Sequence, residues 1–204
     1  MMNISRAAAL VLTAMTALAP LNAALPAPNA PAAMVTGNVT SQPIGHYEFC
    51  QRYRDECNIR SKSSAAPRLT EHGWGVVREI NVSVNTTITP MTDLEVYGRE
   101  EVWAFPVDAG DCEDFVLAKR QKLIKAGFQP SDLLITVVRK PDGEGHAVLT
   151  LRTAGGDFVL DNLVDEIKPW YATPYSYLKR QATFDTGRWV TIENTADVLV
   201  GALQ

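Results

Sequence analysis

A predicted helix followed at once by three predicted strands restricts the fold of this chain more than any other feature. The helix spans residues 111–126, where Asp111 can cap it, Asp114 occupies the capping-box position and Gly127 ends it. The strand-like runs cover residues 133–139, 146–152 and 158–163, with glycine-bearing turns at residues 141–145 and 154–157. Because such short connections join antiparallel strands, the sequence predicts an α+β fold with a helix packed on an antiparallel β meander.

A second amphipathic helix is predicted upstream. Its apolar residues recur at intervals of three and four: Trp74, Val77, Ile80, Val84 and Ile88. We expect Pro90 and a turn at residues 92–93 to end it, and residues 97–105 to form a loop or a short strand. Residues 119–122, the polar middle of the later helix, should face solvent, and the aromatic-rich residues 170–190 should pack against the sheet.

The composition excludes several classes of protein. The 204 residues carry 19 Lys and Arg against 23 Asp and Glu, a formal net charge of −4, and no basic run is present. Nucleic-acid binding is therefore not expected. With 46% hydrophobic residues and no repeat of any period, the chain is neither disordered overall nor a repeat protein.

The N-terminal residues have the pattern of a secretory signal peptide. Arg6 precedes an apolar run at residues 7–19, and small residues follow. This run is too short to span a bilayer, which takes about 20 residues. The prediction is a signal peptide at residues 1–24, a Pro/Ala-rich linker at residues 25–44 and one domain at residues 45–204. The mature protein would be periplasmic or secreted and without a transmembrane segment; a retained N-terminal anchor is the alternative.

Export would place the three cysteines in an oxidising compartment. Cys50 and Cys57 lie seven residues apart and are the natural pair, which leaves Cys112 as a free thiol. A straight helix would hold the first two about 10 Å apart along its axis, whereas a disulfide needs Cα atoms within about 7 Å. If they pair, residues 50–57 must therefore bend; a bond from either one to Cys112 is the alternative.

Cys112, His146 and Asp161 are the candidate catalytic residues. The chain has no G-x-S-x-G, H-E-x-x-H, Walker or C-x-x-C motif. Cys112 lies in the first turn of its helix, where unpaired N–H groups and the helix dipole favour a thiolate. His146 begins a strand and could take the thiol proton, and Asp161 ends the partner strand and could orient the imidazole. Singly, a buried cysteine, a surface histidine and a turn-forming aspartate are simpler interpretations; together they favour a catalytic site.

The pairing of these two strands decides whether His146 and Asp161 can touch. A two-residue turn at residues 155–156 would pair Thr150 with Asp161, which places His146 and Asp161 on the same face of the sheet. Four residues of strand would still separate them by about 13 Å. Contact therefore requires a shifted register, a bulge or a strong twist.

Carboxylates cluster around the candidate thiol in the sequence: Asp108, Asp111, Glu113 and Asp114. Helix capping accounts for them most simply, and a calcium site is the alternative because hard cations take several oxygen ligands. Carboxylates beside a thiol raise its pKa, in opposition to the helix terminus, and a bound Ca²⁺ would relieve that repulsion.

Three blocks in this order resemble the bacterial transglutaminase-like cysteine peptidase family: residues 110–115, 145–149 and 159–162. Further similar features between residues 45 and 192 are Asn81, Asn85, Tyr97, Gly98, Trp103, residues 177–181 and the Cys50–Cys57 pair. The resemblance implies a papain/transglutaminase-like fold with Cys112 as nucleophile, His146 as general base and acid, and Asp161 as the orienting group. The backbone N–H of Cys112 would contribute to an oxyanion hole, with Trp103 as a candidate second donor.

The resemblance also implies a cofactor and a class of substrate. The best-known relatives are periplasmic, calcium-dependent proteases that release large surface adhesins. Their acidic calcium ligands match Asp111 and Glu113, with Asp114 as a weaker match, and no organic cofactor is expected. The implied partner is a protein substrate at the cell surface or in the periplasm. The same triad could serve a transglutaminase or a glutamine deamidase, and a non-catalytic binding module is the remaining alternative.

Overall fold

The computed structural model describes residues 32–62 and 65–193, so the predicted signal peptide lies outside the described residues. Within them the strands form a seven-stranded sheet in the order β1-β9-β8-β4-β5-β6-β7, and each neighbouring pair is antiparallel. These strands are β1 (Thr36–Thr40), β4 (Leu133–Arg139), β5 (Gly145–Thr153), β6 (Gly156–Leu160), β7 (Lys168–Pro169), β8 (Ser176–Ala182) and β9 (Asp185–Ile192). The predicted meander is therefore β4, β5 and β6.

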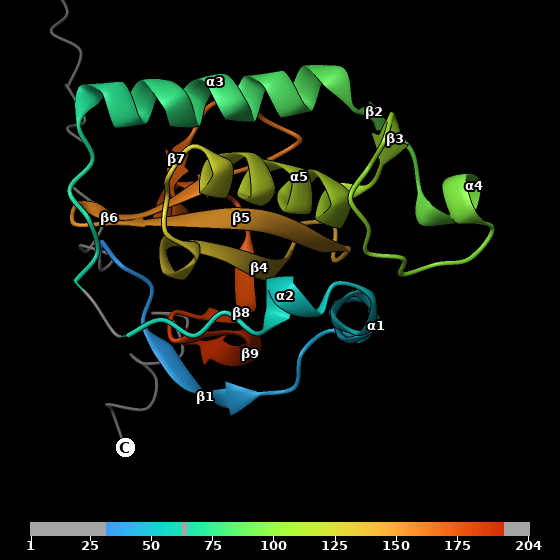
Figure 1. The fold of residues 1–204 in the computed structure, drawn as a ribbon, viewed down its shortest axis with the longest axis horizontal. Coiled ribbons are helices and arrows are strands. Elements are labelled where there is room, and N and C mark those ends of the chain that lie inside the picture. The colour runs from blue at the N-terminus through green and yellow to red at the C-terminus, as the bar shows by residue number, and fades with distance from the viewer. Residues whose placement is uncertain (1–31, 63–64, 194–204) are drawn as a thin grey trace, which may run out of the picture.

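The helices lie mostly on one side of this sheet. They are α1 (Ile44–Arg52), α2 (Arg54–Cys57), α3 (Glu71–Thr87), α4 (Asp93–Tyr97), α5 (Cys112–Lys125), and the 3-10 turns η1 (Pro130–Asp132) and η2 (Trp170–Ala172). α5 packs on β5, and α3 packs on the other side of α5 (Figure 1). A short parallel pair, β2 (Thr89–Pro90) and β3 (Ala109–Gly110), leads directly into α5. The predicted α+β fold, with a helix packed on an antiparallel meander, is confirmed.

The middle of α5 does not face solvent as predicted. Lys119 and Arg120 are only 1% and 3% exposed, whereas Lys122 is exposed. The helix is covered on two sides, by the sheet and by α3, so a narrower face than expected reaches water (Figure 1). Arg120 donates from Nε to the Leu133 carbonyl and from Nη1 to Glu56 of α2, each at 3.1 Å.

Most of residues 170–190 extend the sheet, whereas Trp170 packs against it as expected. β8 pairs with β4, and β9 pairs with β8. The outer edge of β9 then pairs with β1, which lies within the expected linker at residues 25–44. The fold therefore includes residues upstream of residue 45.

Two capping predictions differ from the structure. Thr92 does not simply close α3; it begins α4, where its side chain and that of Glu95 form a capping box. Asp111 is the N-cap residue of α5, but its side chain accepts no hydrogen bond from the backbone N–H groups of residues 112–125. Asp114 accepts instead from the Ala104 N–H at 2.8 Å, so it holds the preceding loop.

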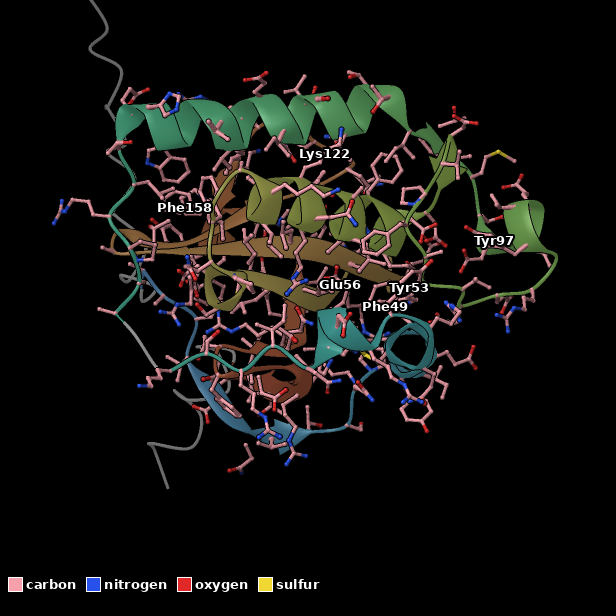
Figure 2. The ribbon with its side chains drawn as sticks, viewed as in Figure 1. Phe49, Tyr53, Glu56, Tyr97, Lys122 and Phe158 are labelled. Atoms are coloured by element: carbon pink, nitrogen blue, oxygen red, sulfur yellow. A yellow bond between two sulfur atoms is a disulfide. The ribbon has the colours of Figure 1, made fainter. Side chains whose placement is uncertain are left out.

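Cys50 and Cys57 form a disulfide, with their Cα atoms 5.6 Å apart. The chain bends between them as expected, because α1 ends before Tyr53 and α2 begins after it. The rings of Phe49 and Tyr53 pack at the bend, with centroids 4.8 Å apart (Figure 2). Cys112, the third cysteine of the described chain, is free.

Candidate active site

Cys112 and His146 line one groove at the start of α5. Cys112 is the first residue of α5, where β3 delivers the chain, and His146 is the second residue of β5. Their groove has a volume of about 380 Å³. A second groove of about 360 Å³, lined in part by Asp93 and Glu113, reaches Cys112 from the side of α4. The thiol therefore lies where two grooves meet.

A shift in the register of β5 and β6 brings His146 and Asp161 together. Thr150 pairs with Val159 rather than with Asp161, so the two-residue turn is at residues 154–155, one residue earlier than expected. This leaves about two residues, or roughly 7 Å, between His146 and Asp161 along the ladder. The side chains span that distance, and His146 Nε2 lies 2.9 Å from Asp161 Oδ1.

Asp161 is only 5% exposed and accepts three hydrogen bonds. Oδ1 accepts from His146 Nε2 and, at 3.0 Å, from the Leu163 N–H, while Oδ2 accepts from the Tyr175 hydroxyl at 2.5 Å. Burial alone would raise the pKa of Asp161, but these hydrogen bonds outweigh it and hold the pKa below its usual value. Because an ionised carboxylate only accepts, Nε2 carries the ring proton and Nδ1 is left unprotonated in the neutral ring.

α3 fixes the loop that follows Asp161. Asn85 Nδ2 donates to the Asp161 carbonyl at 2.9 Å and to Asp165 Oδ1 at 2.7 Å. Asn81, one helical turn earlier, donates from Nδ2 to the Asp165 carbonyl at 2.9 Å. Both asparagines belong to the features that resemble the peptidase family, and the structure places them behind the loop 161–165.

Burial and a neighbouring carboxylate oppose ionisation of the Cys112 thiol. Sγ donates to Glu113 Oε2 at 3.0 Å. Burial and the Glu113 carboxylate raise the pKa of Cys112 well above its usual value, although the Ala147 N–H acts in the opposite direction. Of the two opposing effects expected from the sequence, the nearby carboxylate, together with burial, outweighs the helix dipole in this arrangement.

A buried carboxylate cluster lies beside the thiol, and Asp93 belongs to it. Oxygen atoms of Asp93, Asp111 and Asp114 lie within 4.8 Å of one another. Asp93 and Asp114 are 3% and 0% exposed. Burial and the neighbouring carboxylates raise the pKa of Asp111 to about 8 and that of Asp114 to about 7. Glu113, the remaining predicted ligand, lies in an adjoining group with Asp111 and Cys112.

Asp93 and Tyr175 are residues of this site that the sequence did not predict. Asp93 follows Thr92 and was expected to serve only as a turn residue, and no local pattern marks Tyr175. Trp103, the candidate second oxyanion donor, packs its ring against those of His46 and Trp189, with centroids 5.5 and 6.4 Å away. It lines neither groove at the thiol, so this arrangement does not favour that role.

A match to a known protein family identifies the chain as a cysteine peptidase. The sequence matches the family of bacterial transglutaminase-like cysteine proteinases over residues 36–197, and the chain belongs to that family. No protein with a curated description matches the sequence.

Solved structures of Legionella pneumophila LapG are similar to this chain. The calcium-bound form is 21% identical with a TM-score of 0.50, over 64% of this chain and 80% of that chain. The EGTA-treated form is 22% identical with a TM-score of 0.49, over 64% and 79% of the two chains. The similarity to the calcium-bound form is one of fold. With the family match, it confirms the expected transglutaminase-like fold.

Proposed function

We propose that the chain is an exported peptidase in which Cys112, His146 and Asp161 act as the catalytic triad. The observation that supports this best is the buried contact of 2.9 Å between His146 Nε2 and Asp161 Oδ1, in a site that also holds a free thiol. The contact fixes the imidazole and directs Nδ1 away from the carboxylate. The groove shared by Cys112 and His146 gives a substrate access to both side chains.

The proposed reaction proceeds through a thioester. His146 Nδ1 takes the proton of Cys112, and the thiolate attacks the carbonyl carbon of the scissile peptide bond. The backbone N–H of Cys112 donates to the oxyanion, and the imidazolium protonates the leaving amine as the C–N bond breaks. His146 then takes a proton from the attacking water and returns it to the sulfur when the acid product leaves. Asp161 stabilises the imidazolium in both stages.

Asp93, Asp111 and Asp114 are proposed to hold a calcium ion. Each has a buried carboxylate oxygen without a hydrogen-bond partner among the described residues: Asp93 Oδ1, Asp111 Oδ1 and Asp114 Oδ2. Three buried oxygen atoms that lack a donor fit a hard cation, which takes carboxylate oxygens as ligands. Glu113 stays a candidate ligand. When bound, the cation would offset the negative charge that raises the pKa of Cys112.

A periplasmic or secreted location, and a protein substrate in the periplasm or at the cell surface, complete the proposal. The signal-like N-terminus and the family match support the location. No helix in residues 32–62 or 65–193 combines the length and hydropathy needed to cross a membrane.

Alkylation of the thiol tests the proposed triad without a known substrate. In the calcium-loaded protein, iodoacetamide should label Cys112 at pH values well below the usual thiol pKa of about 8.5. His146→Ala should shift this labelling to higher pH, because the imidazolium that stabilises the thiolate is lost. His72→Ala, at an exposed histidine of α3, is the matched control and should leave the profile unchanged. Slow labelling that does not depend on His146 would contradict the triad.

Calcium removal should destabilise the protein. At a calcium concentration of about 100 times Kd, binding contributes about 2.7 kcal/mol, so EGTA should lower the Tm by roughly 5–10 °C. Asp93→Asn should remove most of this difference, whereas Glu100→Gln, at an exposed carboxylate in the same groove, should preserve it. Thermal unfolding with and without EGTA measures the effect. Equal Tm values in the wild type would contradict the calcium site.

A further inference from the structure

Tyr175 contacts two of the three proposed triad residues. It lies between η2 and β8, and its hydroxyl donates to Asp161 Oδ2 at 2.5 Å. Its ring meets the His146 imidazole edge to face, with centroids 5.5 Å apart and planes at 61°. Asp161 Oδ1 already accepts from His146 and from the Leu163 N–H, and Tyr175 is the donor to the other carboxylate oxygen, Oδ2.

Hydrogen bonds to both carboxylate oxygens fix the orientation of the Asp161 side chain. The last torsion of an aspartate side chain is soft, so hydrogen bonds to one oxygen alone leave the carboxylate free to turn. A buried carboxylate oxygen without a donor is also costly. The Tyr175 hydroxyl prevents both, because it fixes the carboxylate plane with Oδ1 on the imidazole and favours the charged form of Asp161.

The segment that carries Tyr175 is itself anchored. Tyr177 donates to the Trp170 carbonyl at 3.2 Å and accepts from Thr173 Oγ1 at 2.9 Å. These bonds fix residues 170–177 beside the sheet but do not involve the triad. Tyr175 is half-buried and Tyr177 fully buried, so the two tyrosines of one segment offer a matched comparison.

We propose that Tyr175 is a positioning residue that fixes Asp161, and through it the His146 imidazole, for proton transfer with Cys112. The proposal rests on the triad proposed above. Removing the hydroxyl leaves Asp161 less able to stabilise the imidazolium. On the acid side of the pH profile, the thiolate–imidazolium pair should then form only at a higher pH. On the alkaline side, the imidazolium should lose its proton at a lower pH, so the pH range in which the pair exists becomes narrower.

Other groups also act on the charge of Asp161. They are His146 from β5, Lys119 from α5 and Tyr177 from β8. His146 acts through the hydrogen bond used in the proposed mechanism, and Lys119 and Tyr177 act on Asp161 through charge alone. To assign a change in the pH profile to the Tyr175 hydrogen bond, the same substitution at Tyr177 must therefore be measured for comparison.

The test compares Tyr175→Phe and Tyr177→Phe in the calcium-loaded protein. The rate of iodoacetamide labelling of Cys112 is measured against pH, and unfolding in urea is followed in parallel. Tyr175→Phe should lower the labelling rate at pH 6 by about tenfold to hundredfold, the effect of one hydrogen bond to a charged group. Tyr177→Phe should lower the stability but keep the wild-type pH profile. Tyr175→Trp, which keeps a ring and an N–H donor, should retain more of the profile than Tyr175→Phe.

Each outcome decides the proposal. An unchanged profile in Tyr175→Phe, or equal shifts in the two phenylalanine variants, would overturn the role of Tyr175 while a His146-dependent profile keeps the triad. Should Tyr175→Phe not fold, Tyr175→Trp and Tyr175→Ala decide: a narrower profile in the alanine variant than in the tryptophan variant supports positioning, and equal profiles in these two variants oppose it. A wild-type profile that does not respond to His146→Ala would instead overturn the proposed triad itself.

Discussion

Replacement of Cys112 by alanine should abolish peptide hydrolysis and leave the fold intact. The sulfur is the attacking atom in the proposed reaction, and loss of the nucleophile in hydrolases with a similar triad costs about six orders of magnitude in kcat. The side chain is half-buried at the first residue of α5, so removing one sulfur should cost about 1 kcal/mol of stability. Hydrolysis of a protein substrate and unfolding in urea are measured for the variant and for the wild type.

Cys112→Ser separates the chemistry from the packing. The serine hydroxyl keeps the shape of the side chain and can donate to Glu113 as the thiol does. Its much higher pKa makes it a poor nucleophile beside an imidazole in this site, so the variant should be as stable as the wild type and inactive. Unfolding of both variants would make Cys112 a packing residue, and wild-type hydrolysis in either would place the nucleophile elsewhere.

The parts of the fold that follow local patterns could be predicted from the sequence. The spacing of Val77 and Val84 identifies the buried face of α3, and Gly127, with φ +97, follows α5 where a helix end favours glycine. The polar middle of α5 could not be predicted, because burial there depends on α3 covering a helix that already lies on the sheet. β1 was missed for a similar reason: its pairing partner β9 lies at the other end of the domain.

The candidate site, like the fold, could be predicted only where local sequence patterns determine it. Cys112 and His146 could be identified from their places at the start of a helix and of a strand, but the contact to Asp161 depends on one residue of register. Gly155 and Gly156 both suit a turn, so the sequence alone does not decide between the two alignments. In the structure Gly156 is already in β6, where a side chain would meet the Ala32 carbonyl oxygen. The N-terminal segment thus helps to select the register that the site needs.

Lys119 is the polar group of α5 whose burial is hardest to explain by packing. It is 1% exposed, and its burial lowers the pKa from 10.5 to about 7, although attraction to Asp161 and Asp165 acts in the opposite direction. A methionine of similar length could fill this position without a charge. A buried cation that faces the proposed triad aspartate is therefore a candidate for a functional requirement that lowers stability.

Lys119→Met should stabilise the protein near neutral pH, and its advantage should disappear at alkaline pH. The folded wild type loses the Lys119 proton near pH 7 and the unfolded chain near pH 10.5, so the unfolded state binds more protons between these values. The stability of the wild type should therefore rise relative to the variant by about 1.4 kcal/mol per pH unit in this window. Urea unfolding at pH 6 to 9 measures this, with Lys122→Met on the exposed face as control.

A difference between wild type and Lys119→Met that stays constant with pH would contradict a depressed lysine pKa. A pH-dependent gain in stability together with slower labelling of Cys112 would have a more specific meaning. The charge of Lys119 would then support the ionised Asp161, and the fold would hold a destabilising cation because Asp161 must keep its own charge.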